Sequence, residues 1–129
     1  MASRRSEIAA SYSTAFRDLP AIEIPTRLPG VSHAWHLYPI RLHLEQLRVD
    51  RARFIQELRN RQVGASVHFI PLHRQPFYAQ RYGYHPGAFP VAEREFPRLI
   101  SLPIYSRMTD DDVASVIWAV SDVVAHFQR

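Results

Sequence analysis

The segment from Val67 to Tyr78 concentrates the side chains that are best suited to chemistry. Its sequence, Val-His-Phe-Ile-Pro-Leu-His-Arg-Gln-Pro-Phe-Tyr, sets two histidines, two prolines and a tyrosine around a short apolar run. Prolines and bulky residues stiffen the backbone, so imidazole and phenol groups that follow a strand can be held over a cleft. Because loops usually carry function, we expect this segment to face a ligand.

Histidines are also the first candidates for metal ligands, and two pairs could share an ion: His33 with His36, or His68 with His73. On a strand, the first pair would point to opposite faces, whereas a zinc site needs three or four converging ligands. We therefore interpret His33, His36 and His43 as ordinary surface or partly buried histidines and expect no metal. For His68 and His73, residue chemistry alone leaves ligand contact and simple packing equally open.

The residue types that are missing narrow the chemistry further. All sixteen basic residues are arginine, so no lysine amine is available for a Schiff base with a carbonyl substrate or with pyridoxal phosphate. No Gly-x-Ser-x-Gly motif is present, and none of the four scattered glycines begins a phosphate-binding Gly-x-Gly-x-x-Gly run. We therefore expect no catalytic residue and no catalysis by this chain alone.

Length and composition indicate one globular domain with a modest core. The chain has 129 residues, of which 47% are hydrophobic and 22% charged, and it contains no cysteine for disulfides or metal ligation. No apolar run approaches the length of a membrane span, and the first residues lack the apolar centre of a signal peptide. We expect a cytoplasmic protein.

The net charge of +4 leaves a non-enzymatic alternative open. Five arginines cluster between Arg48 and Arg61 in an aromatic-rich chain, as in a basic binding module for nucleotide or RNA. However, Glu45, Asp50 and Glu57 interrupt the cluster, and mixed charges are more typical of a solvated helix face. Nucleic-acid binding is thus the second hypothesis.

Apolar spacing and punctuating residues predict a series of short elements. Pro39 within its strand suggests an edge position or a bulge. Asp50 and Thr109 are expected to cap helices, the second with Asp110 to Asp112 in its first turn. In order, we predict a helix over 3–19, a strand over 34–42, a helix over 50–62, a strand over 65–70, a loop over 71–87 with at most a short helix, a helix over 88–96, a strand over 99–102 and a helix over 110–127, whose buried stripe comprises Val113, Val116, Ile117, Val120, Val124 and Phe127.

These elements predict an α/β fold, a two-layer sandwich in which a small, mostly antiparallel three-stranded sheet carries helices on one face. The other face of such a sheet would lie open. Because exposed sheet faces and edges in small domains usually meet another domain, a partner is expected.

Four pieces of the chain, taken in order, carry a family resemblance. They are His33-Ala-Trp-His-Leu-Tyr-Pro-Ile-Arg-Leu42, the Val67–Tyr78 segment, Phe89-Pro-Val-Ala-Glu93, and Leu99-Ile-Ser-Leu-Pro-Ile-Tyr105 followed by Met108-Thr-Asp-Asp-Asp-Val113. Together they resemble the C-terminal small domain of DegT-type (DegT/DnrJ/StrS) pyridoxal-phosphate-dependent nucleotide-sugar aminotransferases. The resemblance runs from about residue 4 to the end.

This resemblance implies the small domain of a fold-type I enzyme that transfers an amino group from glutamate to a keto nucleotide sugar for polysaccharide, lipopolysaccharide or antibiotic sugars. In that family the large domain holds the cofactor and supplies the Schiff-base lysine, and neither has a counterpart here. We therefore expect residues 1–129 to form a single domain that begins partway through the interdomain helix, with the large domain absent. The chain would be an excised or truncated domain, one part of a split enzyme, or a binding module.

The resemblance also implies roles for individual residues. The small domain closes one side of the active-site cleft, so His68, His73 and Tyr78 are expected to face the nucleotide sugar. Arg74 and Arg41 are weaker candidates for the same substrate, since a guanidinium suits a carboxylate or diphosphate, but Arg41 at a strand end could equally form a structural ion pair. No cofactor should be held covalently by this chain. The expected partners are the large domain, the nucleotide sugar and a possible second copy, without membrane.

Overall fold

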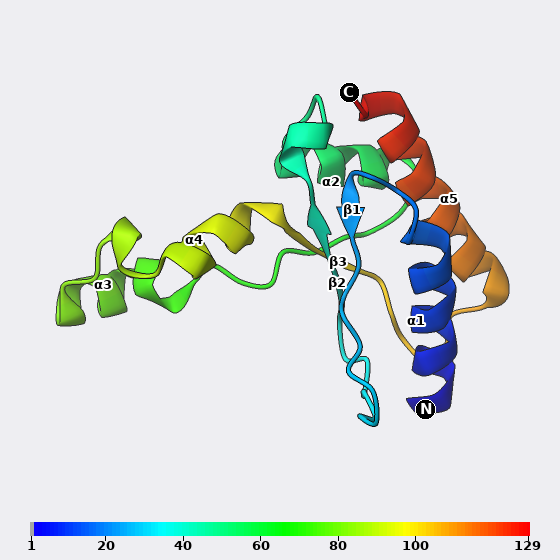
Figure 1. Cartoon of the computed structure of the whole chain (residues 1–129), viewed down its shortest axis with the longest axis horizontal. Coiled ribbons are helices and arrows are strands. Elements are labelled where there is room, and N and C mark those ends of the chain that lie inside the picture. The colour runs from blue at the N-terminus through cyan, green and yellow to red at the C-terminus, as the bar shows by residue number, and fades with distance from the viewer. Residues whose placement is uncertain (1) are drawn as a thin grey trace.

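A computed structural model describes residues 2–129, and its ribbon divides into two parts (Figure 1). The first part, which we call the body, comprises residues 2–66 and 99–129. The second, the arm, comprises residues 67–98 and extends away from the body. The body contains α1 (Ala2–Phe16), β1 (Ile22–Glu23), β2 (Tyr38–Leu42), the 3-10 turn η1 (Leu44–Gln46), α2 (Arg51–Asn60), β3 (Leu99–Leu102) and α5 (Asp110–Phe127), and the arm contains η2 (Leu72–Arg74), α3 (Pro76–Tyr82), η3 (Pro86–Ala88), α4 (Pro90–Glu95) and η4 (Phe96–Arg98).

The sheet has the strand order β1-β2-β3, and both pairings are antiparallel. Side chains alternate along β2, where Tyr38, Ile40 and Leu42 are buried while Pro39 and Arg41 are only half-buried. The body's helices α1 and α5 pack side by side on the buried face, and α2 packs on α5 and β3. The predicted fold class, a three-stranded antiparallel sheet with helices on one face, is confirmed.

Two side-chain caps fix where helices begin. The Asp50 carboxylate accepts a hydrogen bond from the Arg53 backbone N–H at 2.8 Å at the start of α2. Thr109 and Asp112 form a reciprocal capping box at the start of α5, with bonds of 2.8 and 3.1 Å. Both predicted caps are confirmed, and three aspartates occupy the positive end of α5 as expected.

The hydrophobic core lies between the sheet and the three helices. Tyr12 and Tyr38, both fully buried, meet edge to face with ring centres 5.2 Å apart. Their hydroxyls are paired: Tyr12 donates to the Pro103 carbonyl at 2.8 Å, and Tyr38 bonds the Ser13 hydroxyl at 2.9 Å. Of the predicted α5 stripe, Val113, Val116, Val120 and Val124 are buried and Ile117 and Phe127 half-buried, whereas the buried Ala119 and Val123 were missed.

The predicted strand over residues 65–70 is wrong. Only an isolated bridge forms there, between Ser66 and Ser101, after which the chain turns away from the sheet into the arm. Phe69 and Ile70 consequently stay exposed, although an aromatic and a β-branched residue both favour a strand. The third strand is instead β1, whose two residues pair with Leu42 and Arg41 and are too few to give a periodic signal.

The strand predicted over 34–42 begins only at Tyr38. Trp35 has a φ of +47°, outside the extended region, and this interrupts the strand. Pro39 lies in the central strand, but β1 pairs only with residues 41–42, so β3 alone borders Pro39. Helix boundaries differ from the prediction by a few residues, because α1 ends at Phe16 and α2 at Asn60; the predicted helix over 88–96 is α4 followed by a 3-10 turn.

Candidate functional site

The arm carries large apolar side chains but does not bury them. Among residues 67–98, all of which the structure describes, no hydrophobic side chain is buried; every residue of the core cluster belongs to the body. The arm nevertheless contains nine of the thirteen exposed large hydrophobic residues in the described chain. Phe69 is 75% exposed and Phe77 67%. A surface of this kind usually meets a ligand or another protein surface.

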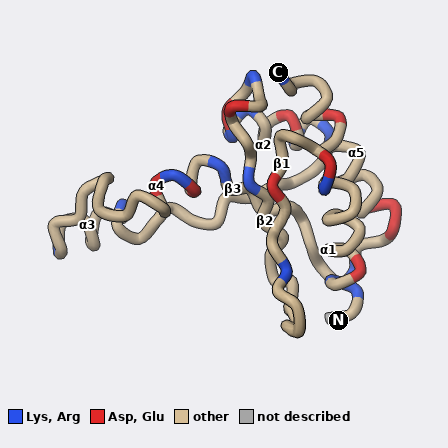
Figure 2. Tube along the Cα trace, viewed as in Figure 1, with Lys and Arg blue, Asp and Glu red and all other residues tan. Residues whose placement is uncertain are grey.

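Ion pairs hold the last residues of the arm, 95–98, against the open face of the sheet. We call these residues the root of the arm. Figure 2 shows the arm's charges gathered near α4 and β3, with few around α3. Arg98 donates to the Leu42 carbonyl at 2.9 Å and pairs with Glu23 and Glu95 at 3.0 and 3.3 Å. Arg41 pairs with the same Glu23 at 2.8 Å. The guanidinium of Arg41 is thus part of an ion-pair network. A structural ion pair was the alternative to substrate contact that the sequence left open for this residue.

A second attachment joins the root to α2. The Arg51 Nη1 donates to the Phe96 carbonyl, and its guanidinium carbon lies 4.5 Å from the centre of the Phe96 ring. Burial lowers the pKa of Arg51 from its ordinary value. Arg74 of the arm approaches the same ring at 5.5 Å. Phe96 therefore lies between a cation of the body and a cation of the arm.

Within the arm, Glu93 of α4 binds two residues of η2. Its Oε1 lies 2.5 Å from the His73 Nε2 and 2.8 Å from the Arg74 Nε, and Arg74 Nη2 contacts the other oxygen. The Arg74 guanidinium first and the His73 imidazole second lower the pKa of Glu93 to about 2. His73 is the arm's one buried residue, so this clamp, made of His73, Arg74 and Glu93, fixes η2 against α4.

Aromatic rings line a pocket beside the clamp. Ring centres follow one another at 4.8 Å from His73 to Phe89, 5.1 Å from Phe89 to Tyr84, 5.6 Å from Tyr84 to Tyr82 and 6.3 Å from Tyr82 to Tyr78. Tyr82 stacks on both of its tyrosine neighbours. The lining is completed by small or apolar side chains: Pro71, Leu72 and Ala92.

The structure brings together some of the predicted substrate residues and separates others. His73 and Tyr78 line the arm pocket, and Arg74 lies next to it with its guanidinium bound to Glu93. His68 is half-buried on the segment that leads into the arm, where its Nδ1 is buried without a hydrogen-bond partner. Arg41 belongs to the sheet. Whether any of the five contacts a substrate stays a prediction.

Three aromatic residues and one acid of this site were not predicted. Tyr82 and Tyr84 stand out in the sequence as part of a tyrosine-rich loop, and Phe89 belongs to a recognised motif, but nothing in their spacing indicates a shared pocket. Glu93 lies 20 residues after His73, so only the fold could reveal that pair. Stacked rings with one fixed imidazole suit a ligand that has flat or apolar faces and a few polar groups.

The arginines that suggested nucleic-acid binding are mostly engaged within the body. Arg53 pairs with Glu57 at 2.7 Å, and Arg61 pairs with both Glu57 and Asp122 at 2.9 and 2.7 Å. Within residues 2–129, Arg59 of α2 alone in this cluster has no ion pair or hydrogen bond. This arrangement matches the solvated helix face rather than a row of free cations.

The described residues contain neither a membrane-spanning helix nor a cluster of metal ligands. No helix among residues 2–129 is long and apolar enough to cross a membrane. In the same range, no group of three or more histidine, aspartate or glutamate side chains is arranged to hold a metal ion.

Comparison with known proteins gives a consistent result. Residues 1–121 match the model of the DegT/DnrJ/EryC1/StrS aminotransferase family. The chain is 49% identical over 125 residues to the uncharacterized protein MJ1066 of Methanocaldococcus jannaschii and 42% identical over 125 residues to the spore coat polysaccharide biosynthesis protein SpsC of Bacillus subtilis. The two matches cover 97% and 96% of this chain but only 32% of each relative.

Solved structures agree with the sequence relatives. The chain superimposes on S. venezuelae DesV, solved in complex with a ketimine intermediate, with a TM-score of 0.84 at 30% identity, covering 95% of this chain and 31% of DesV. It also superimposes on the putative sugar aminotransferase Spr1654 of Streptococcus pneumoniae in its PLP form, with a TM-score of 0.84 at 26% identity, covering 98% of this chain and 32% of Spr1654.

Proposed function

Since the chain belongs to the DegT/DnrJ/EryC1/StrS aminotransferase family, we propose that it is the C-terminal domain of a sugar aminotransferase and that its arm forms one wall of the substrate cleft. The reaction proposed for the complete enzyme is transfer of an amino group from glutamate to a keto nucleotide sugar. The family predicted from the four motifs is thereby confirmed, while donor, sugar and cleft remain parts of this proposal.

The uncovered aromatic pocket of the arm is the observation that carries the proposal. The arm buries no hydrophobic side chain of its own, yet polar contacts determine its position at the root and at the clamp. Fixed aromatic rings can stack on a base or on the apolar face of a sugar, while phenol and imidazole groups bind hydroxyls. The aromatic pocket is formed by this chain, but no other part of the described chain covers it. This fits a cleft whose opposite side is supplied by another domain.

Each candidate residue has a proposed task in that wall. His73 and Tyr78 would contact the nucleotide sugar, and Glu93 would act as a positioning residue that holds the imidazole. Arg74, bound to Glu93, would present the outer side of its guanidinium to a phosphate or carboxylate. His68, with its unpaired Nδ1, is proposed as a hydrogen-bonding residue at the mouth of the cleft. Arg41 would support the root and act on the substrate only indirectly.

The residues of this chain do not fit pyridoxal phosphate as a covalent ligand. That cofactor is attached through a lysine amine, and the 129 residues contain no lysine. We therefore assign the chain no covalent step and propose that a separate large domain, in the same or another polypeptide, holds the cofactor. The matched relatives are about three times as long as this chain, which supports such a partner. A homodimer and the cytoplasmic location stay predictions.

A chimera tests the proposal directly. The matched third of Bacillus subtilis SpsC would be replaced by this chain, and formation of amino sugar from glutamate and keto nucleotide sugars would be measured. We expect an active chimera, and an inactive chain when it is assayed alone with the same substrates and added cofactor. Replacing His73 or Tyr78 by Ala in the chimera should raise KM for the nucleotide sugar about fivefold or more, because buried ligand contacts each stabilise binding by about 1–2 kcal/mol.

The matched control is Phe77→Ala, which removes an exposed ring from the same helix as Tyr78 but outside the pocket lining. KM should stay within about twofold in this variant. A folded chimera that binds no nucleotide sugar, or equal losses for Phe77 and Tyr78, would show that the arm pocket is not the substrate wall. Amino sugar formed by the isolated chain would contradict the assignment of the chemistry to a second domain.

A further inference from the structure

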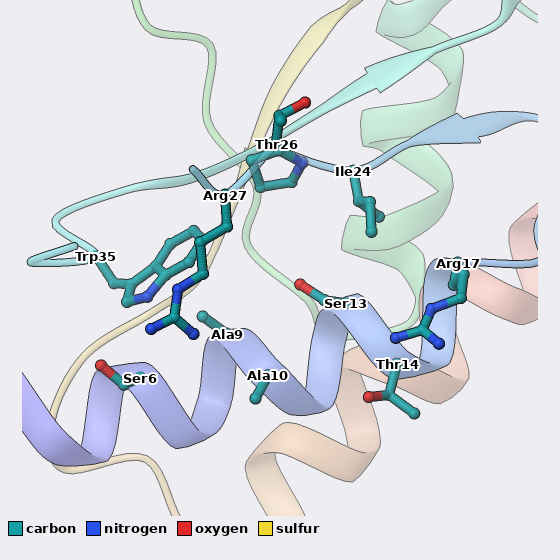
Figure 3. A pocket seen from close by; sticks show the side chains of 11 residues that line it. Ser6, Ala9, Ala10, Ser13, Thr14, Arg17, Ile24, Thr26, Arg27 and Trp35 are labelled. Carbon is teal, nitrogen blue, oxygen red and sulfur yellow. The ribbon is translucent and has the colours of Figure 1, made fainter. Parts of the chain in front are cut away.

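A hollow on the far side of the body from the arm is not used by the proposed function. It lies between α1 and the segment that runs from the end of β1 to Trp35 (Figure 3). Figure 1 places α1 and the arm on opposite sides of the sheet. The floor of the hollow consists of small α1 side chains, and its opposite wall is the loop with Trp35 and Pro25. The lining residues are Ser6, Ala9, Ala10, Ser13, Thr14, Arg17, Ile24, Pro25, Thr26, Arg27 and Trp35.

Two arginines mark this hollow as cationic. Figure 3 shows the Arg27 side chain reaching from the loop toward α1, while Arg17 lies just after the end of α1, beside Thr14. Neither guanidinium has an ion pair or hydrogen bond within residues 2–129, and no acidic residue belongs to the lining. Elsewhere in the chain, arginines such as Arg61 and Arg98 are paired with carboxylates. An unneutralised pair of guanidiniums facing one hollow favours an anion.

We propose that this hollow binds the phosphate or diphosphate group of a small molecule. Guanidinium groups bind phosphate oxygens in a bidentate manner, and the Thr14 hydroxyl, beside Arg17, can donate a further hydrogen bond. Half-buried Pro25 and the edge of the largely buried Trp35 form the apolar part of the lining, next to which the organic group of the ligand would lie. This site is independent of the arm pocket and of the substrate proposed for it.

The extent of the positive surface favours a small anion over a nucleic acid or an acidic protein segment. Toward the N-terminus of α1, Arg4 already pairs with Glu7 and Asp110 at 3.3 and 2.7 Å. Among the described residues that line the hollow, Arg17 and Arg27 are the only cations, whereas nucleic-acid sites extend along a row of cations. Ser13, between the two arginines, forms a hydrogen bond with the buried Tyr38, and this bond connects the floor of the site to the hydrophobic core.

The two tryptophans of the chain provide a local test. Inorganic pyrophosphate would be titrated into the complete 129-residue chain while the indole N–H signals of Trp35 and Trp118 are followed by NMR, with Trp118→Phe used for assignment. Trp118 is 59% exposed on α5 and does not line the hollow. We expect a saturable shift of the Trp35 signal and no shift of the Trp118 signal.

Matched variants separate this site from general charge attraction. Arg17→Gln and Arg27→Gln should each raise the dissociation constant at least fivefold, while Arg27→Lys should retain part of the affinity. Arg107→Gln removes the same charge from an exposed loop residue without an ion pair in the described chain and should change the constant less than twofold. Far-ultraviolet circular dichroism would verify that each variant is folded.

Three outcomes would overturn the proposal. One is the absence of a saturable Trp35 shift in the folded wild-type chain. Another is an equal loss of affinity in the Arg107 variant, which would indicate diffuse attraction. The third is displacement of pyrophosphate by an oligoglutamate peptide at lower concentration than by ATP, which would assign the hollow to an acidic protein segment. Competition by ATP with little effect of the peptide would support the small-molecule site.

Discussion

The body and the arm use their hydrophobic side chains in opposite ways. In the body, rings such as Tyr12, Tyr38 and Phe54 are fully buried. In the arm, rings such as Phe69 and Phe77 are mostly exposed, and the buried residue is a histidine held by an acid. Apolar burial therefore stabilises the body, whereas hydrogen bonds and ion pairs at a few points determine the shape of the arm.

This difference separates stability from function within one small chain. Regions with few buried apolar contacts open locally at low cost without unfolding the rest of the molecule. The arm has this property and also carries the candidate pocket, so its mobility and its ligand contacts can change while the core stays intact. The following predictions test that separation, beginning with the largest expected effect on global stability.

Truncating a core ring should destabilise the protein far more than truncating an arm ring. Phe54→Ala removes a fully buried side chain between α2 and the rest of the core, and we expect a loss of about 3–5 kcal/mol in the free energy of unfolding. Phe77→Ala removes a ring that is 67% exposed, and the loss should stay within about 0.5 kcal/mol. Urea unfolding measures both. Similar losses would mean that the arm and the body share one core.

The attachment at the root should contribute an intermediate amount. Arg98→Met removes the hydrogen bond to the Leu42 carbonyl and the pairs with Glu23 and Glu95, so the free energy of unfolding should fall by about 1–2 kcal/mol. Arg94→Met is the matched control, because Arg94 is exposed and pairs only with its neighbour Glu95; it should cost less than about 0.5 kcal/mol. An equal effect of the two changes would refute a structural role for the network.

The capping box of α5 provides a test confined to the body. Thr109→Ala removes the side-chain acceptor for the Asp112 N–H, and the expected loss is about 1 kcal/mol. Hydrogen exchange should accelerate in the first turn of α5 and remain unchanged in the arm. Thr26→Ala, at an exposed loop threonine, should be nearly neutral. Faster exchange in the arm of the Thr109 variant would show that the two regions are coupled.

Acid should open the arm's clamp at a pH set by Arg74, with the smallest effect on global unfolding. The carboxyl of Glu93 has its pKa lowered from 4.5 to about 2, so the clamp is complete above pH 4.5 and is lost as the pH falls through about 2. In Arg74→Gln, which removes the largest cause, the midpoint should move up toward 4.5. The Glu93 carboxyl carbon signal in NMR reports the midpoint directly. A wild-type midpoint near 4.5 would contradict the clamp.

The sequence predicted best where local chemistry decides the structure. The caps at Asp50 and Thr109 and the strand Leu99–Leu102 follow from side-chain hydrogen bonding and periodicity, and all three were correct. The α5 stripe was correct at four positions, whereas two predicted residues are only half-buried and two buried ones were missed. The fold class also follows from element order. In the arm the same reasoning failed, because residues 65–70 have strand propensity but leave the sheet after a single bridge at Ser66.

The candidate site was only partly accessible from the sequence. His73 and Tyr78 could be singled out because their types and flanking prolines indicate a ligand-facing loop. Their partners could not, because Glu93 and Phe89 meet His73 only after η2 and α4 pack together. The role of Arg41 was left open between substrate and ion pair, and the contact with Glu23 depends on β1, a two-residue strand without a recognisable pattern.

The two chain segments that lead into and out of the arm are joined by two backbone hydrogen bonds. The Ser66 N–H donates to the Ser101 carbonyl at 3.0 Å, and the Ser101 N–H donates to the Ser66 carbonyl at 2.8 Å. These backbone bonds hold Ser66 and Ser101 together, and they involve no side chain of the residues between them. Residues 67–95 contribute no side chain to the hydrophobic core. We therefore expect this stretch to tolerate exchange for the corresponding stretch of a relative without loss of core packing in the body.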